Sequence, residues 1–241
     1  NMGLTCPGRQ TFEASSAIAR QHGVKDGKAV FVRQNPAAIN AGAFHNDVVA
    51  VSNKNVFFYH EEAFIDPKGL QKELQAAAGD MELVFVEVPS SDVPLKDAVT
   101  SYLFNSQLVS PDTRDGMTLI LPKEVEETPS TKAFVDKMLA SNGPIKHADY
   151  MEVRQSMRNG GGPACLRQRV ALSDDDLNAL TAKVIITDDR IEELKVWVNK
   201  HYRDRLMPAD LGDAALMEEC FTALDELTQI LNIGSVYDFQ R

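Results

Sequence analysis

One cysteine in this sequence is set apart by the residues before it. Cys165 follows the segment NGGGPA at 159–164, and glycines allow a backbone to approach a ligand closely because they carry no Cβ. We expect Cys165 to stand at the start of a strand, accessible, and able to act as a nucleophile. Buried, unreactive cysteines are commoner than reactive ones, but the glycines favour reactivity. The loop is not a phosphate-binding loop, because the pattern GxxxxGK[ST] is absent.

His45 is the histidine best placed for acid and base chemistry. It precedes an apolar segment and lies two residues before Asp47, a spacing that points both side chains to one face of an extended chain. A positioned imidazole can donate and accept the protons that a nucleophilic reaction moves. The Asp47 carboxylate can hold a planar guanidinium through two parallel hydrogen bonds. A histidine and an aspartate at the end of a surface loop would give the same pattern.

Two weaker candidates are the polar residues Asn159 and Arg9. Asn159 opens the glycine loop and can offer its amide to a substrate, although asparagine there is also an ordinary turn former. Arg9 can pair with a substrate carboxylate, as any exposed arginine can. The remaining histidines lie at element ends or in charged surroundings and do not compete with His45: His22, His60, His147 and His201.

The other two cysteines carry no predicted chemistry. Cys220 lies on an apolar stripe at helical spacing, so we expect it in the core, and Cys6 lies beside Pro7 near the terminus. The chain has three cysteines, with neither CxxC nor zinc-ligand spacing. This usage indicates a reducing compartment and no metal site.

The elements that position these residues follow a repeated order. A helix is predicted over 11–21, and then a polar opening, strand, turn, strand, helix and strand recur with a period of roughly 60 residues. The first copy opens at 45–47, with strands at 48–52, 56–60 and 83–88, a turn at 53–55 and a helix at 68–78. The second opens at 105–107, with a turn at 111–116, strands at 117–121 and 148–153 and a helix at 131–140.

A third copy departs from this order. It opens at 159–165 and enters a strand at 165–172, after which helical patterns continue to 231. Short mixed units at a fixed period suggest modules around an axis, because each needs its neighbours to cover its apolar face. The three openings would then face one centre. An ordinary α/β domain with a chance repeat remains the alternative.

Composition excludes several classes of function. The chain has 241 residues, a net charge of -10 and a pI of about 5.0, which argues against a nucleic-acid partner. Apolar residues make up 44% and charged residues 25%, as in globular proteins. No apolar stretch approaches the roughly 20 residues of a membrane span, and no signal peptide pattern is present. We therefore expect no membrane partner and a cytoplasmic location.

Five strings resemble the N-succinylarginine dihydrolase family over essentially the whole chain: HNDVVAVSN, VFFYHEEAF, NSQLVS, SMRNGGGPACLRQRVAL and LNIGSVYDFQR. The family belongs to the guanidine-modifying superfamily, so the resemblance implies an α/β pentein fold, a pseudo-fivefold ring of ββαβ modules. The chain would form a partial ring with C-terminal helices. Residues 4–241 would be the C-terminal part of the catalytic domain, with modules over about 45–172 and a helical segment over 173–241.

The resemblance also implies roles for individual residues. Cys165 corresponds to the nucleophile, His45 to the catalytic histidine, and Asp47, Asn159 and Arg9 to substrate-binding positions. The implied reaction converts N2-succinylarginine and two waters to N2-succinylornithine, two ammonia and carbon dioxide in arginine catabolism, without a cofactor.

The family's chain is about twice as long, and its N-terminal half supplies a catalytic glutamate. The opening Asn-Met-Gly therefore looks like the start of a fragment. We expect the full-length protein to be a homodimer. Two alternatives remain: another guanidine-modifying enzyme, of arginine deiminase or amidinotransferase type, and a non-catalytic fragment that associates through exposed edges.

Overall fold

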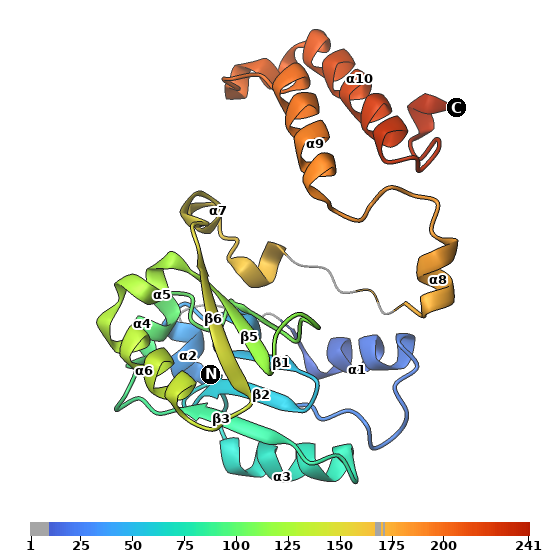
Figure 1. The fold of residues 1–241 in the computed structure, drawn as a ribbon. Coiled ribbons are helices and arrows are strands. Elements are labelled where there is room, and N and C mark those ends of the chain that lie inside the picture. The colour runs from blue at the N-terminus through green and yellow to red at the C-terminus, as the bar shows by residue number, and fades with distance from the viewer. Residues whose placement is uncertain (1–9, 167–169, 171) are drawn as a thin grey trace. The chain divides into compact units, whose positions relative to one another are not determined.

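A computed structural model describes residues 10–166, 170 and 172–241 of the chain. The chain divides into two compact units, Asn1–Gln168 and Arg169–Arg241 (Figure 1). The first unit is mixed α/β and the second is helical. Among the described residues, no helix is both long and apolar enough to cross a membrane.

The elements of the first unit alternate between helices and short strands. Its helices are α1 (Phe12–Gln21), α2 (Pro36–Asn40), α3 (Pro67–Ala78), α4 (Leu95–Thr100), α5 (Lys123–Glu127), α6 (Pro129–Ala140) and α7 (Arg154–Arg158). Its strands are β1 (Ala50–Asn53), β2 (Val56–His60), β3 (Val84–Val88), β4 (Gln107–Val109), β5 (Met117–Pro122) and β6 (Ile145–Met151). Two 3-10 turns, η1 (Asn46–Val48) and η2 (Pro163–Leu166), complete it.

Two three-stranded sheets share one topology, β1-β2-β3 and β4-β5-β6. In each sheet the first pair is antiparallel and the second pair is parallel, with a helix crossing between the parallel strands. Val56 pairs with Val84 in one sheet and Met117 with Ile145 in the other. The β-β-α-β order predicted for the first two copies is therefore confirmed.

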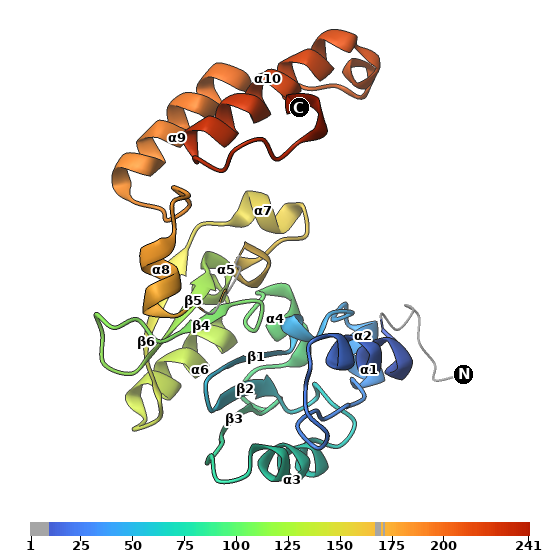
Figure 2. The same cartoon turned by 90° about the vertical axis from the view of Figure 1, so that its right-hand side faces the viewer.

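The two sheets are joined through one apolar core. Phe58 from β2 packs against Phe104 and Phe134, with ring centroids 4.7 and 6.4 Å apart. Strand β1 runs beside β4, and the Asn53 amide donates to the Ser110 hydroxyl over 2.8 Å. Figure 2 shows the sheets between α3 on one side and α5 on the other. Burial of these aromatic rings makes the two modules one body, which positions their openings relative to each other.

Several predicted strand boundaries were wrong, three of them for clear reasons. The strand predicted at 48–52 begins only at Ala50, because Val48 and Val49 donate to the carbonyls of His45 and Asn46 and close a 3-10 turn. Strand β6 begins at Ile145 rather than 148, since buried Ile145 pairs with Met117. Cys165 lies in η2 rather than at a strand start.

The rest of the predicted strand at 165–172 also departs from the prediction where it is described. Leu166 belongs to η2, and Val170 and Leu172 are not in a strand. Residues 167–169 and 171 lie outside the described residues.

The second unit is built on two long helices. It contains α8 (Asp174–Ala179), α9 (Asp188–His201), η3 (Pro208–Gly212), α10 (Ala214–Ile230) and η4 (Asp238–Gln240). Trp197 of α9 is buried and donates to the Ala223 carbonyl of α10 over 2.9 Å. The buried residues of α10 are Ala223 and Thr228, whereas Cys220 is exposed. The prediction that Cys220 lies in the core was therefore wrong.

Candidate functional site

His45 and Asp47 lie together at the opening of the first module. Nδ1 of His45 is 3.9 Å from Oδ1 of Asp47, and their side chains are 43% and 36% exposed. His45 has extended backbone angles, but Asp47 belongs to the turn η1. The prediction that an extended backbone points both side chains to one face was therefore wrong. The two side chains nevertheless approach each other.

One oxygen of Asp47 has no hydrogen bond among the described residues, although Nδ1 of His45 is 3.9 Å away. Oδ1 is buried and accepts no hydrogen bond there. Leaving a carboxylate oxygen unpaired costs free energy, because water has been removed from it. A bound donor such as a guanidinium N–H would supply that hydrogen bond.

The glycine loop begins at a defined helix end. Helix α7 stops as Gly160 adopts a φ of 89°. The Gly161 amide donates to the Ser156 carbonyl and the Gly160 amide to the Met157 carbonyl, over 2.9 and 2.8 Å. This pair of bonds is a Schellman stop, which requires a residue such as glycine in the left-handed region. The chain then turns through Pro163 into η2, which presents Cys165 exposed.

Cys165 is held against the opening of the second module. Its Sγ lies 3.6 Å from Nδ2 and 3.8 Å from Oδ1 of Asn105, a residue that is 2% exposed. The backbone amide of Ala164 donates to the backbone carbonyl of Asn105. Nε2 of the Gln107 side chain donates to the Pro163 carbonyl over 2.7 Å. The openings at 105–107 and 159–165 are therefore in contact.

Asn105 was not predicted as a site residue, although a signal for it was present. The segment 105–107 was recognised as the opening of the second copy, the position equivalent to 45–47 in the first. Treating all openings alike would have identified Asn105 as a candidate. Its contact with Cys165 spans 60 residues of sequence and follows from the packing of the modules.

The two remaining predicted residues differ in what the structure shows. Asn159 ends α7, is exposed, and donates from its amide to the Gln155 carbonyl over 3.1 Å. This turn-forming contact uses Nδ2 of the side chain and does not involve the amide oxygen. Arg9 lies outside the described residues.

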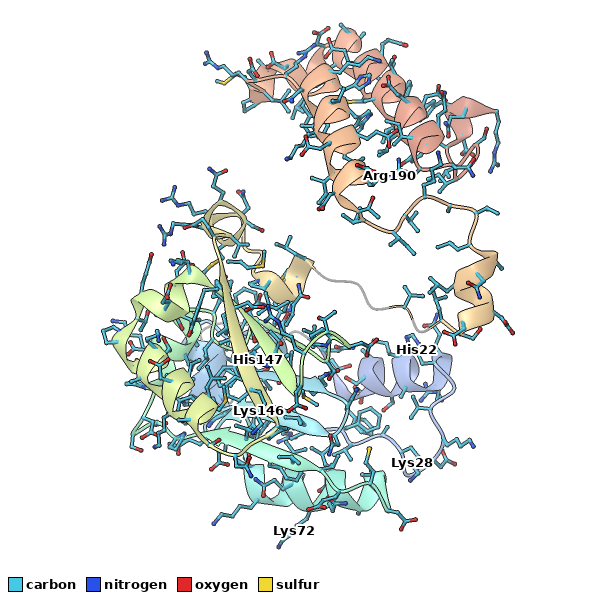
Figure 3. The ribbon with its side chains drawn as sticks, viewed as in Figure 1. His22, Lys28, Lys72, Lys146, His147 and Arg190 are labelled. Atoms are coloured by element: carbon cyan, nitrogen blue, oxygen red, sulfur yellow. The ribbon has the colours of Figure 1, made fainter. Side chains whose placement is uncertain are left out.

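The other histidines have local structural partners. His22 caps the end of α1, and the His147 ring lies 3.0 Å from the Asp115 carbonyl; both are labelled in Figure 3. His201 pairs with Glu226 over 2.8 Å. His60 is fully buried, with Nε2 2.9 Å from the Val93 carbonyl, while Nδ1 accepts from the Glu62 amide.

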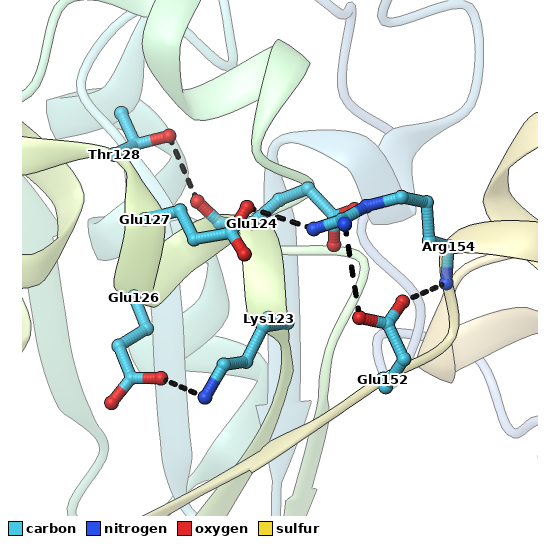
Figure 4. A network of polar contacts seen from close by, with 7 residues as sticks. All are labelled: Lys123, Glu124, Glu126, Glu127, Thr128, Glu152 and Arg154. Carbon is cyan, nitrogen blue, oxygen red and sulfur yellow. Dashed lines mark hydrogen bonds and ion pairs between the residues drawn. The ribbon is translucent and has the colours of Figure 1, made fainter.

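A cluster of charges ties down the segment that leads into the glycine loop. Nε of Arg154, at the start of α7, donates to Glu124 over 2.7 Å, and an Nη atom donates to Glu127 over 2.8 Å (Figure 4). Its backbone amide donates to Glu152 over 3.0 Å. Hydrogen bonds to Glu124 and Glu127 raise the pKa of Arg154 further above its ordinary value. Helix α7 is thereby anchored to α5.

The candidate residues do not gather in either of two surface hollows. A hollow of 410 Å³ is lined by residues of α9, α10 and the loop after α9, and one of 250 Å³ by residues around Phe31, Ile65 and Glu73. Neither is lined by His45, Asp47, Asn159 or Cys165.

Comparison with known proteins decides the family. The model of the succinylarginine dihydrolase family matches residues 2–240. The chain belongs to this family. It is 54% identical over 234 residues to the N-succinylarginine dihydrolase of Marinobacter nauticus, which covers 97% of this chain and 52% of that relative. The relatives from Pseudoalteromonas atlantica and Aeromonas hydrophila are 51% and 52% identical, over 98% of this chain and 52% and 53% of theirs.

The family resemblance inferred from the sequence strings is confirmed by this match. The chain spans about half the length of the curated dihydrolases it matches. The unmatched half of each relative has no counterpart in this chain.

Proposed function

We propose that this chain supplies Cys165 and His45 to the active site of an enzyme that hydrolyses N2-succinylarginine to N2-succinylornithine, two ammonia and carbon dioxide. The family match across residues 2–240 is the observation that carries the proposal. Local geometry supports it, because the Cys165 thiol is exposed and the partly exposed His45 lies beside a carboxylate.

The first half-reaction removes one ammonia. The thiolate of Cys165 attacks the guanidinium carbon, and the tetrahedral adduct expels ammonia with a proton donated by His45. Water deprotonated by His45 then attacks the thiouronium, and the carbon–sulfur bond breaks to regenerate the thiolate. The product carries a ureido group in place of the guanidinium.

The second half-reaction repeats these steps on the ureido carbon. Attack by Cys165 expels the second ammonia, and hydrolysis of the thiocarbamate releases the thiolate and a carbamate, which yields carbon dioxide and the amine of N2-succinylornithine. Two waters enter and no electrons are transferred, so the proposed reaction needs no cofactor.

Substrate placement is assigned to polar residues around these groups. Asp47, whose Oδ1 is buried without a hydrogen bond among the described residues, accepts from the guanidinium. Asn159 offers its exposed amide, and Arg9 pairs with a substrate carboxylate. Orientation by such contacts lowers the entropic cost of bringing the reacting carbon to the thiolate.

We infer that the complete site needs more chain than this. The two ββαβ modules are part of a pentein ring, and a further half of the ring supplies a catalytic glutamate and covers the substrate. The open position of the four described candidate residues, outside both hollows, supports this inference. The relatives' length, about twice that of this chain, supports it as well.

Ammonia release from N2-succinylarginine tests the proposal. The chain is assayed alone and after mixing with a separately expressed N-terminal half of the Marinobacter relative. We expect release after mixing, its abolition by Cys165→Ala, and a strong reduction by His45→Ala. Cys220→Ala is the matched control, because Cys220 is also an exposed cysteine but lies in the second unit.

Two outcomes would contradict the proposal. Release that persists in Cys165→Ala would exclude Cys165 as the nucleophile. Release of one ammonia from free arginine, rather than two from the succinylated substrate, would indicate a deiminase. Family membership favours the dihydrolase over the deiminase and amidinotransferase alternatives.

Association without catalysis is a second candidate role for the isolated chain. The second unit exposes large apolar side chains, including Leu211 at 72%, Val196 at 68% and Tyr202 at 62%. Exposed apolar surface of this kind favours contact between copies. Sedimentation velocity tests this role, and a monomer throughout the micromolar range would argue against it.

A further inference from the structure

Asn105 is a buried polar side chain whose amide faces a sulfur. It is 2% exposed, and its Nδ2 and Oδ1 atoms lie 3.6 and 3.8 Å from Sγ of Cys165. Burying a primary amide costs free energy unless its polar atoms are paired. An apolar side chain of similar size, such as leucine, would fill this place without that cost.

The surrounding backbone is shaped to admit Asn105. A Cβ on Gly162 would lie 2.1 Å from Oδ1 of Asn105 and 2.7 Å from Cδ2 of Tyr102. Tyr102 itself has a φ of 58°, in a region that residues other than glycine rarely adopt. Such strain persists where the surrounding structure enforces it, often at functional sites.

Two hydrogen bonds hold the turn that carries Cys165 beside the segment that carries Asn105. The Asn105 carbonyl accepts from the Ala164 amide, and Gln107 donates to the Pro163 carbonyl. The turn that carries Cys165 is thus attached, through Pro163 and Ala164, to the segment 105–107.

We propose that Asn105 is a positioning residue for Cys165, whose Nδ2–H donates to the sulfur, fixes its direction and favours the thiolate over the thiol. A hydrogen bond to the charged form of a group stabilises that form. The role rests on the proposed function, in which the Cys165 thiolate is the nucleophile. Asn105 acts through Cys165 and does not itself contact the reacting carbon.

Alkylation of individual cysteines by iodoacetamide, followed by peptide mass mapping, tests the role in the intact chain. The thiolate is the reactive form, so the rate reports its population. In Asn105→Leu we expect Cys165 to react about tenfold more slowly at pH 7.5, the effect of losing one hydrogen bond to a charged group. The rate at Cys220 should not change, because Cys220 lies in the second unit.

Two further readouts separate positioning from a purely structural role. The difference in the alkylation rate of Cys165 between wild type and Asn105→Leu should shrink as the pH rises to 10, because the thiolate then forms without the amide's help. Asn105→Ala should slow Cys165 less than Asn105→Leu does, because water can enter and donate in place of the amide. This second variant also serves if the leucine variant does not fold.

The opposite results would overturn the role of Asn105. A structural residue whose loss only loosens the turn would leave alkylation of Cys165 unchanged or faster in a folded variant. Alkylation measures the reactivity of the Cys165 thiol without any substrate. Failure of the proposed role of Asn105 is therefore distinct from failure of the hydrolase assay, which would leave the contact between Asn105 and Cys165 intact.

Discussion

Gly162 lies so close to the buried Asn105 that a Cβ at position 162 would be 2.1 Å from Oδ1 of Asn105. Movement of the Asn105 side chain alone would not make room for that Cβ, because Cδ2 of Tyr102 would also lie 2.7 Å from it. Gly162, which precedes the candidate nucleophile Cys165 in the same loop, is therefore required for packing against the second module.

The first prediction follows from this close approach. Gly162→Ala should lower the free energy of unfolding of the first unit by about 2 kcal/mol, the usual cost of forcing an extra group into a packed site. Chemical denaturation followed by far-ultraviolet circular dichroism measures it. Gly161→Ala is the control with a smaller expected loss, since its Cβ would meet the Ser156 hydroxyl at 3.0 Å, which can rotate away. Equal losses in the two variants would contradict the argument.

The second prediction concerns His60, which is fully buried at the end of β2. His60→Leu leaves the Val93 carbonyl and the Glu62 amide without the ring nitrogens that now face them over 2.9 and 3.1 Å. We expect a loss of about 2–4 kcal/mol, since each unpaired buried group costs about 1–3 kcal/mol. Denaturant titration measures it. His22→Leu should lower the free energy of unfolding far less, because His22 is exposed. A comparable loss in that variant would contradict the role given to the buried contacts of His60.

The third prediction concerns the Arg154 cluster that anchors α7 (Figure 4). Arg154→Ala removes the partners of Glu124 and Glu127, and Glu124 already has one buried oxygen without a hydrogen bond among the described residues. The first unit should melt a few degrees lower. Arg154→Lys should recover only part of the loss, because an ammonium cannot reproduce the guanidinium's two directed bonds. Full recovery by lysine would show that charge alone matters.

The fourth prediction is a loss of stability of the second unit in acid. Hydrogen bonds from Lys200 and then His201 lower the pKa of Glu226 below its ordinary 4.5, and a hydrogen bond from Arg203 does the same for Glu219. These carboxylates stabilise the fold fully above about pH 4.5, and the stabilisation is lost as pH falls through their lowered pKa values.

Trp197 provides the measurement, because it is the chain's single tryptophan and is buried in the second unit. Its fluorescence should report a melting temperature that falls as the pH drops below 4.5. Glu226→Gln should flatten this fall, whereas Glu192→Gln, at a side chain that is 71% exposed, should leave it unchanged. A fall of equal steepness in both variants would exclude Glu226 as a cause.

Local patterns predicted much of the two sheets. Strand β2 was predicted residue for residue at 56–60, and α3 was predicted at 68–78 against the observed Pro67–Ala78. A turn also appeared at 54–55, within the predicted 53–55, with Lys54 at a φ of 49°, while Asn53 ends β1. These features depend on periodicity and turn residues within a few positions, which a single sequence displays.

Predictions failed where partners distant in sequence determine the structure. The apolar spacing around Cys220 suits a helix buried along a full face, but α9 covers a side through Ala223 and Thr228 and leaves Cys220 exposed. The run at 165–172 reads as a strand, yet Cys165 lies in a 3-10 turn fastened to Asn105 and Gln107. Neither partner can be read from the local pattern.

The amino-acid sequence by itself determined the family and the β-β-α-β order of two modules, because these depend on residue types and short-range spacing, and it predicts Cys165 and His45 as the reacting groups. Only the tertiary structure decided that Asn105 faces the Cys165 sulfur and that Gly162 must lack a side chain. That contact spans 60 residues. It arises from burial of one core shared by two modules, which no local pattern encodes.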